Sequence, residues 1–246
     1  KKSVSAEFVA VLARLLTRHG NRVGAILYGD RVDAVIPARG GRRQVLHLMA
    51  SLGKRPPVPK SAGTRLEDLL RAAIGIVPRR SLLFVVSDFV SEPGWDKPLA
   101  HLARRHEVVA VRLYDPLERA LPDLGMVVIE DSETGEQMFV DTHDRGFRKR
   151  FAAAAARREA LVRDAFATAG VDALELATDE DLAGAILRFA DLRKRRTQLA
   201  AGGELAGIGH AHRLEQRRHR QALEFTPRLR VEARAHVLVL GAQQAA

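Results

Sequence analysis

The pattern of hydrophobic and polar residues along the chain predicts buried strands that alternate with helices. The clearest strand is residues 82–86, five consecutive apolar residues that basic residues precede and that Ser87 and Asp88 follow. Such a run is too short for an independent helix and is typical of a strand buried on both faces of a parallel sheet. Because ligands of open α/β sheets bind beyond the carboxyl ends of the strands, Asp88 is the first candidate for a functional residue.

The same patterns predict the elements around this strand. Further strands are expected at residues 23–28, 32–36, 108–113, 126–129, 137–140 and 173–176. Residues 23–28 and 32–36 should form one hairpin, and residues 126–129 and 137–140 another. Helices are expected before Gly20, at residues 45–52, from Thr64 onward, within residues 95–105, at about residues 144–169, and after Thr178. Strands that alternate with helices predict a doubly wound, mostly parallel, Rossmann-like α/β fold.

Composition narrows the class of protein. The chain has 246 residues, of which 46% are hydrophobic, so it has enough apolar material for a core. No apolar run approaches the roughly 18–20 residues that cross a bilayer, and no secretory signal opens the sequence, so we expect neither a membrane span nor export. The absence of cysteine excludes disulfides and thiolate chemistry and fits a reducing compartment, which predicts a cytoplasmic location.

Positive charge is concentrated at the end of the chain. The net charge is +10, and residues 195–246 hold nine Arg against four Glu. We therefore divide the chain into a domain at residues 1–196 and a basic, low-order tail at residues 197–246. Phe225 is the only aromatic residue of the tail, which offers bases no stacking platform, so we expect no nucleic-acid partner.

None of the standard catalytic or phosphate-binding motifs occurs in the sequence. The remaining candidates for a functional site are Thr64 and Asp88. Thr64 and Asp88 should both open on the same rim of the sheet, and a hydroxyl and a carboxylate are hard oxygen ligands suited to Mg²⁺ or Mn²⁺. Each residue also has a purely structural interpretation. Thr64 and Glu67 form a T-x-x-E capping box, and Asp88 can simply end its strand.

Residues 1–196 resemble a von Willebrand factor A-type domain, and more narrowly a bacterial branch of unknown function whose members accompany MoxR-type AAA+ ATPases. The phrases that carry the resemblance are residues 21–28, 37–43, 62–64, 83–89 and 181–196. The resemblance implies a metal-ion-dependent adhesion site made by three loops. Thr64 matches the second loop and Asp88 the third.

The first loop of that site, an Asp-x-Ser-x-Ser motif, is missing from this chain, which begins where the motif should end. We therefore expect an N-terminally incomplete domain. A metal held by Thr64, Asp88 and water alone lacks most of its protein ligands, so Mg²⁺ or Mn²⁺ should bind more weakly than it would to a chain extended upstream.

The resemblance also implies that a central strand is missing between the strands at residues 23–28 and 82–87. Two buried strands would then have unpaired backbone groups, each costing about 1–3 kcal/mol. Residues 237–240 are apolar in sequence and could fill the position, since even ten linker residues extend roughly 33 Å. The Arg- and Ala-rich composition of the tail favours the alternative, a loosely packed tail.

The function that the resemblance implies is not enzymatic. We expect an adaptor that binds a protein partner, a MoxR-type AAA+ ATPase or an acidic client protein, through a metal-bridged carboxylate. A metal-assisted hydrolase at the same rim is the alternative. It would lack an evident general base, because no histidine lies near Thr64 or Asp88 in the sequence and Asp30 or Asp115 would have to serve. A basic nucleic-acid-binding module is the third and weakest option.

Overall fold

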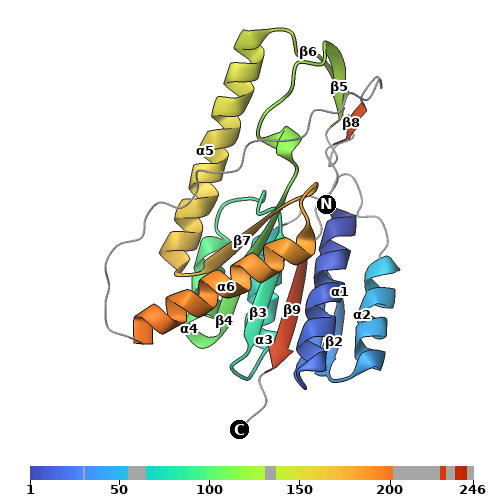
Figure 1. The fold of residues 1–246 in the computed structure, drawn as a ribbon, viewed down its shortest axis with the longest axis vertical. Helices are drawn as coiled ribbons and strands as arrows, with labels where there is room; N and C mark the ends of the chain where they lie inside the picture. Colours follow the sequence, from blue (N-terminus) through green and yellow to red (C-terminus); the bar gives the residue numbers. More distant parts are fainter. Residues whose placement is uncertain (30, 55–64, 131–136, 202–227, 231–235, 243–246) are drawn as a thin grey trace.

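The computed structural model describes residues 1–29, 31–54, 65–130, 137–201, 228–230 and 236–242, which form a mixed α/β fold with two sheets. Figure 1 shows the larger sheet in the body of the molecule and the smaller one beside the far end of a long helix. No described helix has both the length and the apolarity needed to cross a membrane.

The main sheet has six strands in the order β2-β1-β9-β3-β4-β7. Their bounds are β1 Arg22–Tyr28, β2 Val32–Arg39, β3 Leu82–Ser87, β4 Glu107–Tyr114, β7 Asp172–Ala177 and β9 His236–Ala242. Strands β3, β4 and β7 pair in parallel, whereas the β1–β2, β1–β9 and β3–β9 pairs are antiparallel. The prediction of a mostly parallel sheet is therefore wrong for its pairings, because β9 lies antiparallel to both of its neighbours.

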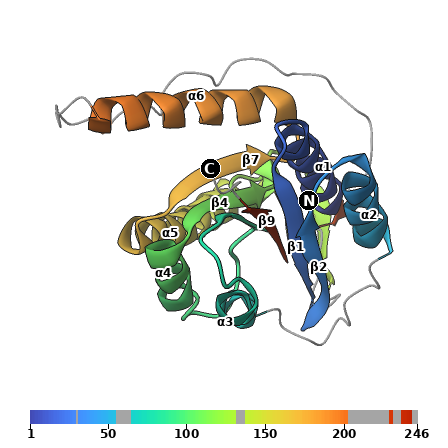
Figure 2. The same ribbon diagram turned by 90° about the horizontal axis from the view of Figure 1, so that it is seen from below.

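Helices cover both faces of this sheet (Figure 2). On one face lie α1 Lys2–Arg18, α2 Arg42–Gly53 and α6 Leu182–Ala201, and on the other lie α3 Leu66–Ile76, α4 Asp96–Arg105 and α5 Arg145–Ala169. Each face has its own apolar core. Phe8, Leu27 and Val86 belong to the first core, and Leu69, Val85 and Phe166 belong to the second. Adjacent residues of β3 thus enter opposite cores, as expected for a strand buried on both faces.

Strand β9 occupies the central position that the sequence analysis left vacant. Val239 is paired with Ala25 of β1 on one side and with Phe84 of β3 on the other. The prediction of a loosely packed tail is therefore wrong for residues 236–242. The buried edges of β1 and β3 explain the difference, because both require backbone partners that only another strand can supply.

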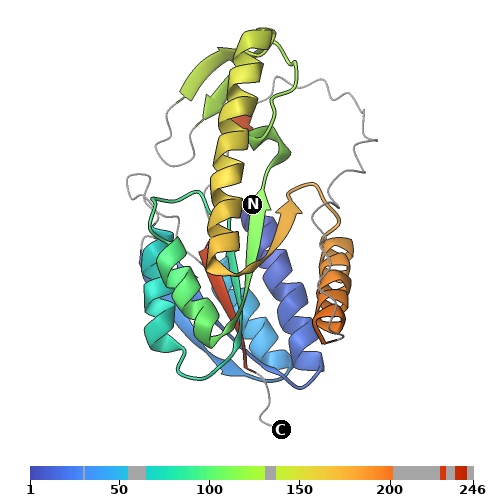
Figure 3. The same cartoon turned by 90° about the vertical axis from the view of Figure 1, so that its left-hand side faces the viewer.

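The second sheet is formed by β6, β5 and β8 in that order. Strands β5 Met126–Glu130 and β6 Gln137–Asp141 make the predicted antiparallel hairpin, and β8 Arg228–Arg230 pairs in parallel with β5. The predicted turn at residues 133–135 lies outside the described residues. Figure 3 shows the hairpin and the first half of α5 projecting together from the body of the molecule, above the carboxyl ends of β3 and β4.

We predict that Val239→Pro destabilises the whole main sheet. Proline removes a backbone donor from a strand with neighbours on both sides and leaves a buried acceptor unpaired, so the free energy of unfolding should fall by about 3 kcal/mol. Urea unfolding followed by circular dichroism measures this loss. Val239→Ala keeps the backbone N–H and is the control, with a smaller expected loss. Unchanged amide-exchange protection of Leu82–Ser87 in the proline variant would contradict the role of β9.

Candidate functional site

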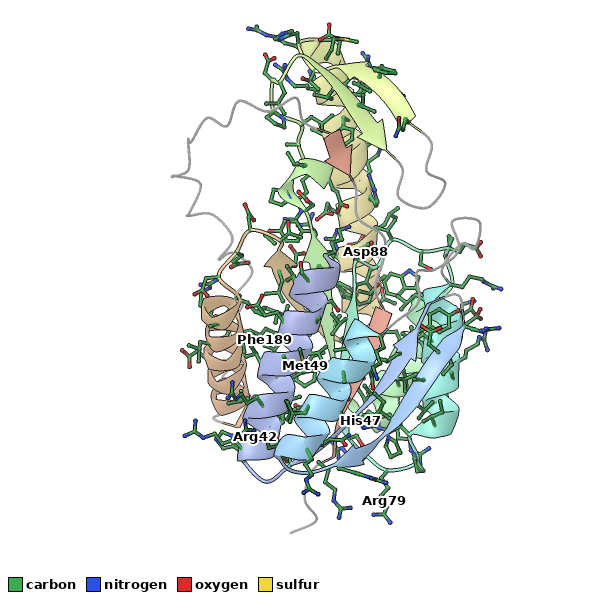
Figure 4. The ribbon with its side chains drawn as sticks, turned by 90° about the vertical axis from the view of Figure 1, so that its right-hand side faces the viewer. Arg42, His47, Met49, Arg79, Asp88 and Phe189 are labelled. Carbon is green, nitrogen blue, oxygen red and sulfur yellow. The ribbon has the colours of Figure 1, made fainter. Side chains whose placement is uncertain are left out.

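Asp88 lies directly after β3, at the carboxyl end of the main sheet (Figure 4). The residue is buried, with 6% of its surface exposed. Its Oδ1 accepts a hydrogen bond from the backbone N–H of Val90 at 3.1 Å, and the Oγ of Ser87 accepts one from the N–H of Phe89 at 2.9 Å. These two bonds turn the chain away from the sheet and hold the Asp88 carboxylate at its rim.

Phe89 holds this turn in an unusual conformation. Its φ angle is 56°, in the left-handed region that costs a residue other than glycine about 1–2 kcal/mol. The buried ring contacts Trp95 and Phe166, with centroid distances of 5.3 and 4.7 Å. Aromatic contacts of this kind offset the backbone cost, so the ring of Phe89 anchors the loop that presents Asp88.

A lysine ammonium group lies against the Asp88 carboxylate. The Nζ of Lys1 is 3.4 Å from Oδ2 of Asp88 and 2.5 Å from Oε1 of Glu118, and 5% of the Lys1 side chain is exposed. A buried carboxylate needs a nearby cation, since an unpaired buried charge costs several kcal/mol. Lys1 therefore places a positive charge beside Asp88, where a divalent metal is also predicted to bind.

Thr64, the second predicted metal ligand, lies outside the described residues, so its distance from Asp88 stays a prediction. Its neighbours are informative, however. The N–H of Leu66, at the start of α3, donates to the Oγ of Ser91 at 3.0 Å, and Arg65 lies 3.3 Å from Glu92. The segment that follows Thr64 therefore lies against the loop that follows Asp88.

The capping interpretation of Thr64 stays a prediction, because Thr64 lies outside the described residues. Helix α3 has Arg65 at its N-cap and no side-chain capping bond from that residue, whereas Ser91 accepts the hydrogen bond from its first N–H. Glu67 instead pairs with Arg71, at 2.6 Å between Oε1 and Nη2. The described helix thus begins at Leu66, with its N-cap one residue after Thr64.

Sequence reasoning missed Glu118, the second carboxylate on Lys1. It ends the short helix η1 Pro116–Glu118, in which the Asp115 side chain accepts from the N–H of Leu117 at 2.9 Å. The Asp-Pro-x-Glu pattern of a capping box at Asp115 was a visible signal for this turn. Nothing in the sequence, however, indicated that the turn faces Lys1.

A second and larger network of ion pairs involves β4, β7 and α5. The Arg112 guanidinium on β4, 4% exposed, pairs with Glu159 of α5 and with Glu175 of β7. Arg119 lies 2.8 Å from each of the same two carboxylates and 3.4 Å from the centroid of the Tyr114 ring. The network therefore ties the main sheet to the helix that carries the projecting hairpin.

The network changes the ionisation of Glu159. Burial alone would raise the pKa of its carboxyl group, but the hydrogen bond and charge of Arg112, with the charge of Arg119, outweigh burial and lower the pKa from its ordinary value. Glu159 therefore stays ionised well below neutral pH and keeps Arg112 paired.

The described ion pairs at this rim join carboxylates to a lysine. No histidine takes part in the ion pairs that join Asp88, Lys1 and Glu118. His106 is buried at the opposite end of the sheet, where burial and the charge of Arg105 lower its pKa. In the described part of the chain, no group of three or more His, Asp or Glu residues has the arrangement of a metal site.

We predict that Glu159→Gln lowers the free energy of unfolding by about 3 kcal/mol at neutral pH, because Arg112 loses a buried partner. The pKa of Glu159 is lower in the folded chain than in the unfolded chain, where it is about 4.3. Its contribution is thus fully present above that value and is lost as the pH falls through the lowered pKa. Urea unfolding from about pH 7 to about pH 3 should show the variant and the wild type converging. Glu7→Gln, on the exposed side of α1, should show no such dependence.

The chain is similar in sequence to uncharacterized mycobacterial proteins. It is 32% identical over 207 residues to the uncharacterized protein Rv1480 of Mycobacterium tuberculosis, a match that covers 84% of this chain and 63% of the relative. It is 36% identical over 172 residues to the uncharacterized protein MAV169 of Mycobacterium avium, covering 70% of this chain and 97% of the relative. The chain thus spans less than two thirds of the length of Rv1480. No solved structure gave a significant match.

The profile of one protein family, described as a protein of unknown function and named DUF58, matches residues 1–161. This confirms the coarser part of the resemblance, whereas the von Willebrand factor A assignment and the association with MoxR-type ATPases stay predictions. By the extent of this match and by the identity to its mycobacterial relatives, the chain belongs to the DUF58 family.

Proposed function

We propose that this chain is a protein-binding adaptor whose partner contacts the carboxyl-end rim of the main sheet at Asp88. One observation carries the proposal: Asp88 is a buried carboxylate, presented by a loop in a strained backbone conformation that the ring of Phe89 anchors. Strain of this kind persists only where the surroundings hold it, and it is concentrated at functional loops.

Charge at the rim supports an electrostatic mode of binding. Asp88 and Glu118 share the Lys1 ammonium group, so the three groups together carry one net negative charge. A divalent cation that joined Asp88 and Thr64 would have to displace or repel this ammonium group, which makes Lys1 a competitor for Mg²⁺ or Mn²⁺. In this proposal the metal, once bound, has an open coordination position that an acidic side chain of the partner completes.

The proposed partner is a MoxR-type AAA+ ATPase or an acidic client protein. The proposal of the ATPase rests on the family resemblance. A metal-assisted hydrolase has less support. Hydrolysis at this rim needs a general base within hydrogen-bonding reach of a metal-bound water. Two described carboxylates that could serve are already engaged, Glu118 by Lys1 and Asp115 by the backbone of its own turn.

We predict that Asp88→Asn weakens the retention of a MoxR-type ATPase from the same genome by about tenfold in a pull-down at constant Mg²⁺, because the variant loses the charge that attracts the metal. Asp164→Asn, an identical change at an exposed position of α5, is the matched control and should retain the ATPase as the wild type does. Equal retention by the two variants would refute the role of Asp88. A failure of the wild type to retain the ATPase would refute this partner.

Calorimetric titration of Mg²⁺ into the chain alone separates the metal from the partner. Lys1→Met removes the competing ammonium group and should raise the Mg²⁺ affinity, whereas Lys97→Met, on the exposed surface of α4, should leave it unchanged. An unchanged or lower affinity in Lys1→Met would show that Lys1 does not compete with the metal.

A further inference from the structure

The end of the main sheet opposite Asp88 collects arginines from segments that are far apart in the sequence. Helices α1 and α4 end there, strands β1, β3 and β4 begin there, and β2 ends there because it is antiparallel to β1. Nine arginines lie in these turns and strand ends: Arg18, Arg22, Arg39, Arg42, Arg43, Arg79, Arg80, Arg104 and Arg105. We call these nine residues the arginine rim. Figure 4 shows two of them, Arg42 and Arg79, at the end of the molecule away from Asp88.

The arginine rim is exposed and poorly neutralised. All nine side chains are exposed, and none forms an ion pair with a described carboxylate. The Arg105 guanidinium donates to the backbone carbonyl of Pro78, which leaves its charge in place. The acidic residues that begin strands at this end are Glu107 of β4 and Asp172 of β7. From β2 to β4 the sheet makes four inter-strand steps, so the rim is roughly 20 Å wide.

Local structure accounts for some of these arginines and not for others. Arg18, Arg104 and Arg105 lie in the last turns of α1 and α4, where a cation stabilises the helix dipole. Arg42 and Arg43 lie instead in the first turn of α2, the end that disfavours cations, and that turn has neither an acidic residue nor a side-chain cap.

Arg22 of β1 and Arg39 of β2 add charge at the edge of the sheet. Arg39 pairs in register with Val23, the residue after Arg22, and adjacent residues of a strand point to opposite faces, so the two guanidinium groups leave this edge on opposite faces of the sheet. Charges retained at a cost in stability, as at Arg42 and Arg43, are typical of residues kept for binding.

We propose that the arginine rim binds an extended acidic segment of a partner protein. The surface extends across the sheet, which suits several carboxylates in a row, and each guanidinium can take a carboxylate in a bidentate pair. The described turns that form the rim contain no Trp, Tyr or Phe, and the exposed large aliphatic residues beside them, Leu15 of α1 and Leu46 of α2, lie on two different helices. Single-stranded nucleic acids are usually bound with aromatic groups and membrane surfaces with a continuous apolar face, so an acidic protein segment fits better.

The test uses the full chain and a fluorescein-labelled polyglutamate peptide of about twelve residues, long enough when extended to cross the rim. Arg42→Glu/Arg43→Glu and Arg79→Glu/Arg80→Glu should each weaken binding by about tenfold in fluorescence anisotropy at about 50 mM NaCl, and wild-type binding should weaken steeply at about 200 mM. The matched control is Arg157→Glu/Arg158→Glu, an adjacent exposed pair on α5 that makes the same change in net charge. Its expected effect is about twofold or less.

Thermal unfolding shows whether the variants are folded. Glutamates in the first turn of α2 suit the helix dipole, so Arg42→Glu/Arg43→Glu should keep or raise the Tm, by up to roughly 2–4 °C. Equal losses of peptide binding in the rim variants and in the control would overturn the proposal. So would tighter binding, lost in the same rim variants, to a DNA duplex of about twelve base pairs or to phosphatidylserine vesicles. The arginine rim lies at the opposite end of the sheet from Asp88, so the Asp88→Asn variant should bind the peptide as the wild type does.

Discussion

Backbone pairing at the centre of the main sheet is the constraint on which the rest of the structure depends. Strands β1 and β3 are buried on both faces, so their N–H and C=O groups have no access to water and must pair with another strand. Strand β9 pairs with both of them along its length. Helices on both faces then have one continuous surface to cover, and the carboxyl end of β3 has a fixed place beside that of β4.

The second constraint is the neutralisation of buried charge. Asp88, Glu159 and Arg112 are each held where an unpaired ion would be costly, and each has a partner from a distant part of the chain. These pairs connect α1, η1, β4, β7 and α5 at one end of the sheet. The arginine rim at the other end has no comparable internal partners among the described residues, and this difference is why we propose that its charge is neutralised by a bound acidic segment.

Much of the fold could be predicted from local patterns. The apolar run of β3, the hairpin of β5 and β6, and the long helix α5 depend on periodicity and turn residues within one segment, and all three are confirmed. The position of Asp88 at a strand end was also predictable. The contacts of Lys1 with Asp88 and Glu118 were not, because such pairs join residues that only the tertiary fold brings together. The preference for a loose tail failed for the same reason: composition describes a segment alone, whereas β9 is stabilised by the two edges it meets.

The place of β9 in the sheet also affects how the chain folds. Val239 pairs with residues roughly 150 and roughly 200 positions earlier, so the central strand of the sheet is among its most distant contacts along the sequence. Loop closure over such distances is slow, and until it occurs β1 and β3 have open, apolar edges that can pair with another molecule. Any form of the chain in which β9 is undocked is therefore prone to aggregate, and docking of that single strand protects both edges at once.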